Sequence, residues 1–74
     1  MVAVEEVRER LVEAFPNSQV QVEDTTGEGD HFDVHVRTPA FTGVTLVGQH
    51  RLVYEALGEL MTRIHALSLR TEPS

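Results

Sequence analysis

The segment GDHFDVHV, residues 29–36, holds the residue types in this chain that are best suited to chemistry. His31 and His35 lie four positions apart, and on a helix this spacing would place both imidazoles one turn apart, where they could share a metal ion. Phe32 and Val34, however, begin an apolar alternation at every second position, which is typical of a β-strand. Four residues of a strand span about 13 Å at roughly 3.3 Å per residue. The two histidines are therefore too far apart to chelate one ion through bonds of about 2 Å.

The strand assignment separates the expected roles of these two histidines. His35 lies within the strand, and we expect a solvated polar side chain on the open face of a sheet. His31 opens the strand directly after the turn TTGEGD, residues 25–30, which contains two glycines. Such a position is exposed and mobile, and it suits a ligand that meets a partner. The alternative for His31 is a turn histidine that hydrogen-bonds the loop backbone.

The other two histidines lie in the second half of the chain. His50 stands near the start of a predicted helix, in GQHRLVY; it could contact an anion, although capping or packing against the preceding turn is favoured. His65 begins a predicted strand, where it shares a side with Leu67 and Leu69. The alternation therefore predicts a half-buried histidine at position 65.

Catalytic motifs are weak. The pairs Asp30–His31 and Asp33–His35 resemble fragments of a catalytic triad, but no serine or threonine stands in a recognisable nucleophile motif. Neighbouring residues of a strand point to opposite faces, which argues against a contact between Asp30 and His31. The turn at residues 25–30 also lacks the lysine and the following helix of a phosphate-binding loop. The sequence does not predict an enzyme.

Hydrophobic periodicity predicts the elements that carry these residues. Apolar residues at helical spacing predict a helix over residues 2–15, and alternation predicts strands over 19–23 and 31–37, joined as an antiparallel hairpin. A second helix is predicted from about Leu46 to Arg63, followed by a strand over residues 65–71 that returns parallel to its neighbour. The predicted fold is a single α/β (α+β) domain over residues 1–74, in the order α-β-β-α-β. It has two layers, with a three-stranded mixed sheet and helices on one face.

Local pairs support the two predicted helices. Glu6–Arg10 and Glu59–Arg63 are each spaced four residues apart, as in pairs that stabilise a helix surface. Phe41 stands in the turn before the second helix, and we expect it to be a buried anchor. The two pairs thus support the helix assignments, and Phe41 is predicted to belong to the core.

Composition narrows the classes of function. The chain has 74 residues, no cysteine, and twelve acidic against six basic residues, a formal net charge of −6. The missing cysteines exclude disulfides and thiolate metal ligands from this chain and favour an intracellular location. No apolar run approaches the roughly 18 residues of a membrane span, and the acidic N-terminus lacks the basic start of a targeting signal. We expect a soluble cytoplasmic protein, and the acidic charge disfavours nucleic acid as its partner.

Three segments resemble, in order and spacing, the BolA-like protein family: GDHFDVHV, then FTGVTLVGQHRLVY, then IHALSLRT. The resemblance extends from the first helix to the last strand, and the combination F-x-G-x₆-H-R-x-V-Y with I-H-A-L-S is specific. It implies an α-β-β-α-β fold similar to the class II K-homology fold, without the GXXG loop of true K-homology domains. This chain also lacks that loop motif.

The resemblance also implies a partner and a cofactor. Members of the family partner with monothiol glutaredoxins, and the heterodimer can bridge a [2Fe–2S] cluster to which the glutaredoxin and glutathione contribute sulfur. The implied nitrogen ligand is the histidine of the IHAL segment, His65, and a second ligand from the hairpin loop would be His31. The isolated chain is expected to be a monomer that binds no cluster tightly.

Two other functions remain open from the sequence. One is a DNA-binding transcriptional regulator that uses the K-homology-like surface, with Arg51 and His50 at the contact, although the net charge and the missing GXXG loop count against it. The other is an adaptor that binds a glutaredoxin without contacting the cluster.

Overall fold

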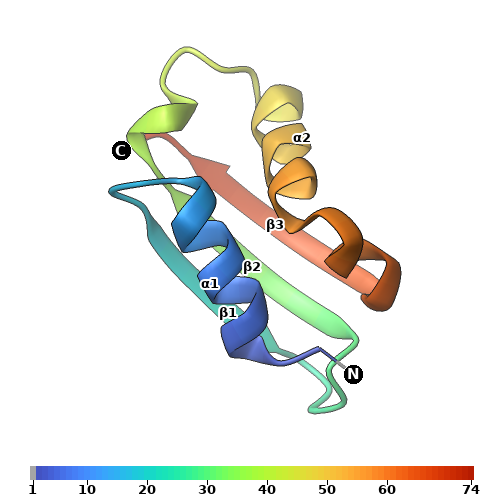
Figure 1. The fold of residues 1–74 in the computed structure, drawn as a ribbon. Coiled ribbons are helices and arrows are strands. Elements are labelled where there is room, and N and C mark those ends of the chain that lie inside the picture. The colour runs from blue at the N-terminus through green and yellow to red at the C-terminus, as the bar shows by residue number, and fades with distance from the viewer. Residues whose placement is uncertain (1) are drawn as a thin grey trace.

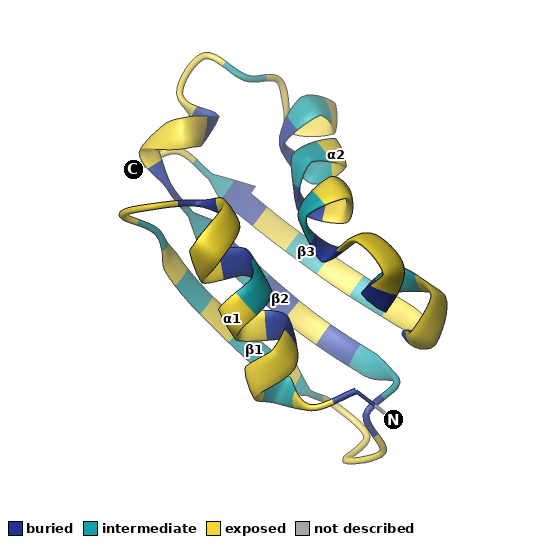
Figure 2. Ribbon diagram, viewed as in Figure 1, coloured by how far each residue is buried: buried dark blue, intermediate teal, exposed yellow. Residues whose placement is uncertain are grey.

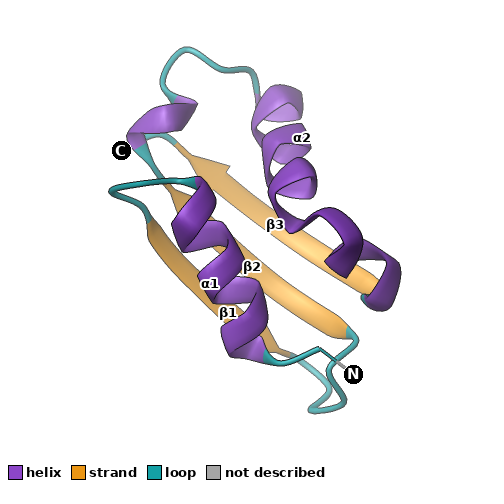
Figure 3. Ribbon diagram, in the orientation of Figure 1, coloured by secondary structure: helices purple, strands orange, loops and turns teal. Residues whose placement is uncertain are grey.

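The computed structural model describes residues 2–74 and has the expected order of elements (Figure 1). The helices are α1 (Val4–Ala14) and α2 (Leu46–Leu57), and the strands are β1 (Gln19–Asp24), β2 (His31–Arg37) and β3 (Ala66–Glu72). Two short 3₁₀ helices, η1 (Pro39–Phe41) and η2 (Gly58–Arg63), precede and follow α2 (Figure 3). Both long helices lie on one side of the sheet, which confirms the two-layer α+β prediction.

The three strands form one sheet in the order β1-β2-β3. β1 and β2 are antiparallel, with Gln19 opposite Arg37 and Asp24 opposite Phe32. β2 and β3 are parallel, with His31 opposite Ala66. The sheet is therefore mixed, and β2 is its central strand.

The core lies between the sheet and the helices. The alternating apolar side chains of the central strand form the sheet side of this core. Figure 2 shows buried residues on the sides of α1 and α2 that face the sheet and exposed residues on their outer sides. Phe41 is fully buried, as expected, and its ring meets that of Phe15 edge-on at a centroid distance of 5.2 Å. The buried apolar residues are Val2, Val7, Leu11, Phe15, Phe32, Val34, Val36, Phe41, Val53, Leu57, Leu60 and Ile64. Among residues 2–74, no helix has the length and apolar character that a membrane crossing needs.

The second helix is shorter than the pattern predicts. α2 ends at Leu57, because Gly58 has a positive φ of 53°, and the chain then continues as η2. The apolar spacing continues through Leu60 and Ile64, which are both buried, so periodicity alone did not reveal the break. α1 similarly spans residues 4–14 rather than 2–15, and β3 begins at Ala66 rather than at residue 65.

The expected Glu6–Arg10 pair within α1 is replaced by pairs between elements. Arg10 contacts Glu59 at 3.1 Å and donates a hydrogen bond to the carbonyl of Leu57, whereas Glu6 contacts Arg63 at 3.4 Å. These contacts join α1 to η2. Sequence spacing identifies only neighbours on the same helix, whereas these partners depend on the packing of α1 beside η2.

Removal of the Phe41 ring tests how much this side chain contributes to the free energy of unfolding. We expect Phe41→Ala to lower the free energy of unfolding by about 3–5 kcal/mol, because it leaves a cavity under the turn before α2. Urea unfolding followed by circular dichroism measures the loss, with Tyr54→Ala as the matched control, since Tyr54 is 43% exposed.

Such a loss approaches the whole stability of a small domain, so Phe41→Leu provides a milder variant. A loss below about 1 kcal/mol in Phe41→Ala, no larger than in Tyr54→Ala, would contradict the assignment of Phe41 as a core anchor.

Candidate functional site

His31 and His65, far apart in the sequence, lie side by side in the structure. His31 is the first residue of β2, and His65 immediately precedes β3. Because these strands are parallel and His31 is opposite Ala66, both histidines lie at the same end of the sheet. Their ring centroids are 5.0 Å apart, with an angle of 55° between the rings. Strand pairing thus brings together the two histidines that the family resemblance implied as ligands.

Both imidazoles are accessible to a partner. The side chain of His31 is 37% exposed, and His65 is also exposed. The predicted half-burial of His65 is wrong, because residue 65 belongs to the connection before β3, where strand alternation does not yet apply. The preceding Ile64, rather than His65, turns into the core at this point.

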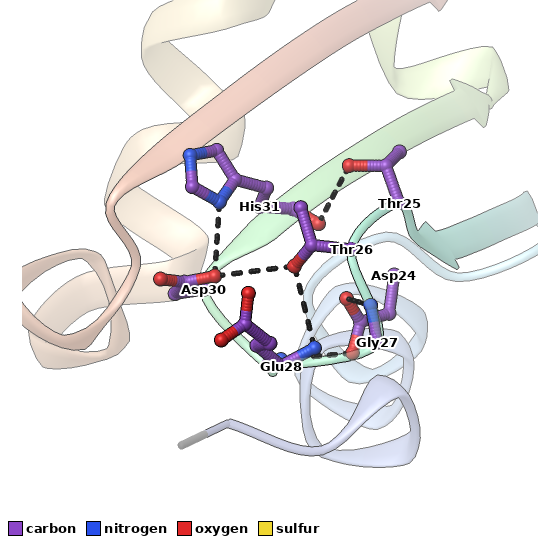
Figure 4. Close-up of polar contacts among 8 residues, drawn as sticks. Asp24, Thr25, Thr26, Gly27, Glu28, Asp30 and His31 are labelled. Carbon is purple, nitrogen blue, oxygen red and sulfur yellow. Dashed lines mark hydrogen bonds and ion pairs between the residues drawn. The ribbon is translucent and has the colours of Figure 1, made fainter.

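Asp30 contacts both histidines, through its side chain and through its backbone carbonyl. Its carboxylate Oδ1 lies 2.9 Å from Nδ1 of His31, so the expectation that these neighbours would not meet is wrong (Figure 4). Asp30 lies in the turn before β2, where neighbouring side chains need not point to opposite faces. Its backbone carbonyl accepts hydrogen bonds from the amides of His65 at 2.8 Å and Ala66 at 3.0 Å. The hydrogen bond with His31 holds the pKa of Asp30 below its ordinary value of 3.8.

The loop between β1 and β2 is held by its own polar side chains. The Asp24 carboxylate accepts hydrogen bonds at 2.9 Å from the amides of Gly27 and Gly29, both of which have a positive φ (Figure 4). Thr26 donates to Asp30, and the amide of Thr25 donates to the backbone carbonyl of His31. The alternative for His31, a turn histidine that hydrogen-bonds the loop backbone, is only partly confirmed. The His31 ring does bind the loop, but through the side chain of Asp30 and not through a backbone group.

His35 lies on the same strand as His31 but belongs to a different set of contacts. Its Nε2 lies 3.0 Å from Oε2 of Glu72, and the other oxygen of Glu72 lies 3.0 Å from Nε of Arg37. His35 lies on the open face of the sheet, as expected, but its side chain is only 26% exposed and has Glu72 as a partner. The cause is the pairing of β2 with β3, which places Glu72 opposite Arg37 and within reach of His35.

His50 and Arg51, the residues considered for DNA contact, lie on α2 with Val47 and Tyr54, and the four line a shallow hollow. Val47 and Tyr54 are 68% and 43% exposed, so this face carries apolar as well as basic side chains. α2 begins near the end of the sheet where β3 finishes, whereas His65 lies where β3 starts (Figure 1). The structure therefore does not bring His50 and Arg51 together with His31 and His65.

The donor set at the paired histidines is incomplete for a metal ion. Within residues 2–74, no group of three or more histidine, cysteine, aspartate or glutamate side chains is arranged to hold one. A pair of accessible imidazoles can supply part of a coordination shell, and further ligands must then come from another molecule.

An α-β-β-α-β domain with a mixed three-stranded sheet and both helices on one face is the fold of BolA proteins in the solved structures that it matches. BolA1 from Arabidopsis thaliana superposes with a TM-score of 0.84 at 33% identity, over 95% of this chain and 89% of that one. Residues 9–74 match the family of BolA-like proteins. This chain belongs to the BolA-like family.

Two relatives show how far the similarity extends. The chain is 38% identical to Protein BOLA2 of Arabidopsis thaliana over 71 residues, which cover 95% of this chain and 76% of the relative. It is 34% identical to the DNA-binding transcriptional regulator BolA of Escherichia coli over 79 residues, with 96% and 75% of the two chains covered.

The Glu72 contacts predict an acid-dependent loss of stability. The hydrogen bond from His35, followed by the charge of Arg37, holds the pKa of Glu72 below its ordinary value of 4.5. A carboxyl whose pKa is lowered by folding stabilises the native state above its unfolded pKa, and this contribution is lost as the pH falls through the folded pKa. The stability difference between the wild type and Glu72→Gln should therefore shrink as the pH drops below 4.5.

Urea midpoints measured from about pH 7 to pH 3 would follow this difference. His35→Ala is the matched background, because it removes the principal cause of the shift and should reduce the effect of Glu72→Gln. A difference that stays constant over the whole pH range would contradict the role assigned to the His35–Glu72 contact.

Proposed function

We propose that this chain is an iron–sulfur trafficking or regulatory protein that binds a monothiol glutaredoxin and contributes His65 and His31 to a bridging [2Fe–2S] cluster. The observation that carries the proposal is the pairing of half-buried His31 with exposed His65, whose ring centroids lie 5.0 Å apart at the end of the sheet where β2 and β3 begin. The partner and the cluster are what the family resemblance implies, and the role is one of binding rather than catalysis.

The donor chemistry supports a shared site. The chain contains no cysteine, so thiolate ligands must come from the glutaredoxin and from glutathione. Imidazole nitrogen can replace thiolate on one iron, and such mixed ligation raises the reduction potential. Since the described residues form no complete ligand set of their own, the isolated chain should not retain the cluster tightly. Dependence on a partner suits transfer or sensing better than storage.

Reconstitution with a monothiol glutaredoxin, glutathione, iron and sulfide tests the proposal. We expect visible absorption and circular dichroism spectra that differ from those of the glutaredoxin homodimer, because nitrogen ligands replace sulfur. His65→Ala should abolish the difference and His31→Ala should weaken it. His35→Ala is the matched control, since it removes a β2 histidine outside the pair and should leave the spectrum unchanged.

Two outcomes would count against this assignment. A wild-type spectrum in His65→Ala, with glutaredoxin still bound, would show that His65 is not a ligand and would favour an adaptor that does not contact the cluster. An effect of His35→Ala equal to that of His31→Ala would show that loss of any histidine on β2 disturbs the complex. Amide NMR spectra of each variant alone would show that the fold is retained.

DNA binding is the second candidate, and two observations favour it. The Escherichia coli relative is named a DNA-binding transcriptional regulator, and Arg51 is exposed beside His50 on the outer side of α2. The net charge of −6 opposes it, and Arg51 is the one arginine among the residues that line this hollow.

Binding to duplex DNA at several salt concentrations distinguishes this candidate from the first. If the α2 face contacts phosphate, Arg51→Gln should reduce the salt slope of binding by about 1, whereas His65→Ala should leave binding unchanged. The cluster proposal expects no such binding at physiological ionic strength.

A further inference from the structure

We propose that Asp30 is the positioning residue of the paired-histidine site. Its carboxylate holds His31 in the tautomer that carries the proton on Nδ1, which leaves Nε2 free to bind a metal. Its backbone carbonyl at the same time places His65 beside that ring. The metal-binding part of this inference rests on the proposed function, whereas the tautomer is a property of the isolated chain.

The distance of 2.9 Å between Nδ1 of His31 and Oδ1 of Asp30 sets the tautomer. An ionised carboxylate only accepts hydrogen bonds, so a contact of this length requires a proton on Nδ1. An aspartate side chain, with an ordinary pKa of about 3.9, is ionised at neutral pH. Thr26 donates a second, longer hydrogen bond of 3.4 Å to the same oxygen, which helps to fix the carboxylate in place (Figure 4).

The other ring nitrogen is then available to a ligand. In neutral imidazole one nitrogen donates and the other accepts, so a proton on Nδ1 leaves the Nε2 lone pair free. Metal-binding histidines commonly donate their second N–H to a carboxylate, which fixes the orientation of the ring and increases its basicity. Asp30 and His31 already have this arrangement in the structure.

The backbone of Asp30 provides the connection to the second histidine. Its carbonyl accepts hydrogen bonds from His65 at 2.8 Å and from Ala66 at 3.0 Å, which anchors the start of β3 next to the turn. The turn is itself braced by the Asp24 carboxylate on Gly27 and Gly29. One residue thus orients the ring of His31 through its side chain and positions the backbone of His65 through its carbonyl.

The tautomer can be measured without any metal. Long-range ¹H–¹⁵N NMR correlations of the imidazoles, recorded on the isolated chain at about pH 8, above the ordinary histidine pKa of about 6.5, distinguish a proton on Nδ1 from one on Nε2. We expect the Nδ1–H form for His31 in the wild type and a shift toward Nε2–H in Asp30→Ala. This substitution keeps the backbone carbonyl, so the hydrogen bonds to His65 and Ala66 should survive.

Asp33→Ala is the matched control for charge. Asp33 is an exposed residue of β2 on the same face as His31, and its loss changes the net charge equally. We expect the wild-type tautomer in this variant. A proton on Nε2 of wild-type His31, or an unchanged tautomer in Asp30→Ala, would overturn the proposal.

The second measurement follows the release of the cluster from the complex with a monothiol glutaredoxin after a chelator is added. Loss of the carboxylate behind a metal-bound histidine typically costs about 10- to 100-fold in metal affinity, so we expect release from Asp30→Ala to be faster by up to about that factor. Asp33→Ala should release at the wild-type rate. Equal release from the wild type and Asp30→Ala would overturn the metal-positioning role. If the wild-type chain formed no shared cluster, the proposed function would fail, and the tautomer alone would still decide whether Asp30 orients His31.

Discussion

The parallel pairing of β2 with β3 is the constraint on which the other features of this structure depend. Parallel neighbours require a crossover connection, which here contains α2 and η2 and lies on the same side of the sheet as α1. The central strand can therefore bury its apolar side under both helices. The same register sets His31 opposite Ala66 and so brings His65 to the beginning of β2. One pairing thus organises both the core and the candidate site.

Short-range hydrogen bonds then give the end of the sheet its detailed geometry. Asp24 and Asp30 lie six positions apart, and each uses its carboxylate differently: Asp24 binds the glycine amides of the loop, whereas Asp30 binds an imidazole. The carbonyl of Asp30 also connects the loop to the start of β3. The loop between β1 and β2 is consequently hydrogen-bonded to the start of β3. A change in the conformation of this loop would therefore alter the position of His65.

The four histidines occupy three different surroundings despite their similar chemistry. His35 lies in an ion-pair group with Glu72 and Arg37 on the open face of the sheet, and His50 lies on the outer side of α2. Only His31 and His65 face each other in the described part of the chain. His31 and His35 each contact a carboxylate, Asp30 and Glu72 respectively, so neither residue type nor an acidic neighbour distinguishes a structural histidine from a candidate ligand.

The sequence by itself determined the type and order of the elements, because alternation and helical spacing report which side of each segment must be apolar. It also excluded the binding of one metal ion by His31 and His35 together, because the rise per residue of a strand places them too far apart. Only the tertiary structure decided that Arg10 pairs with Glu59 and that His65 is exposed. The meeting of Asp30, His31 and His65 depends on a turn conformation and on a strand register. Both arise from contacts between distant segments, which no periodicity within one segment can specify.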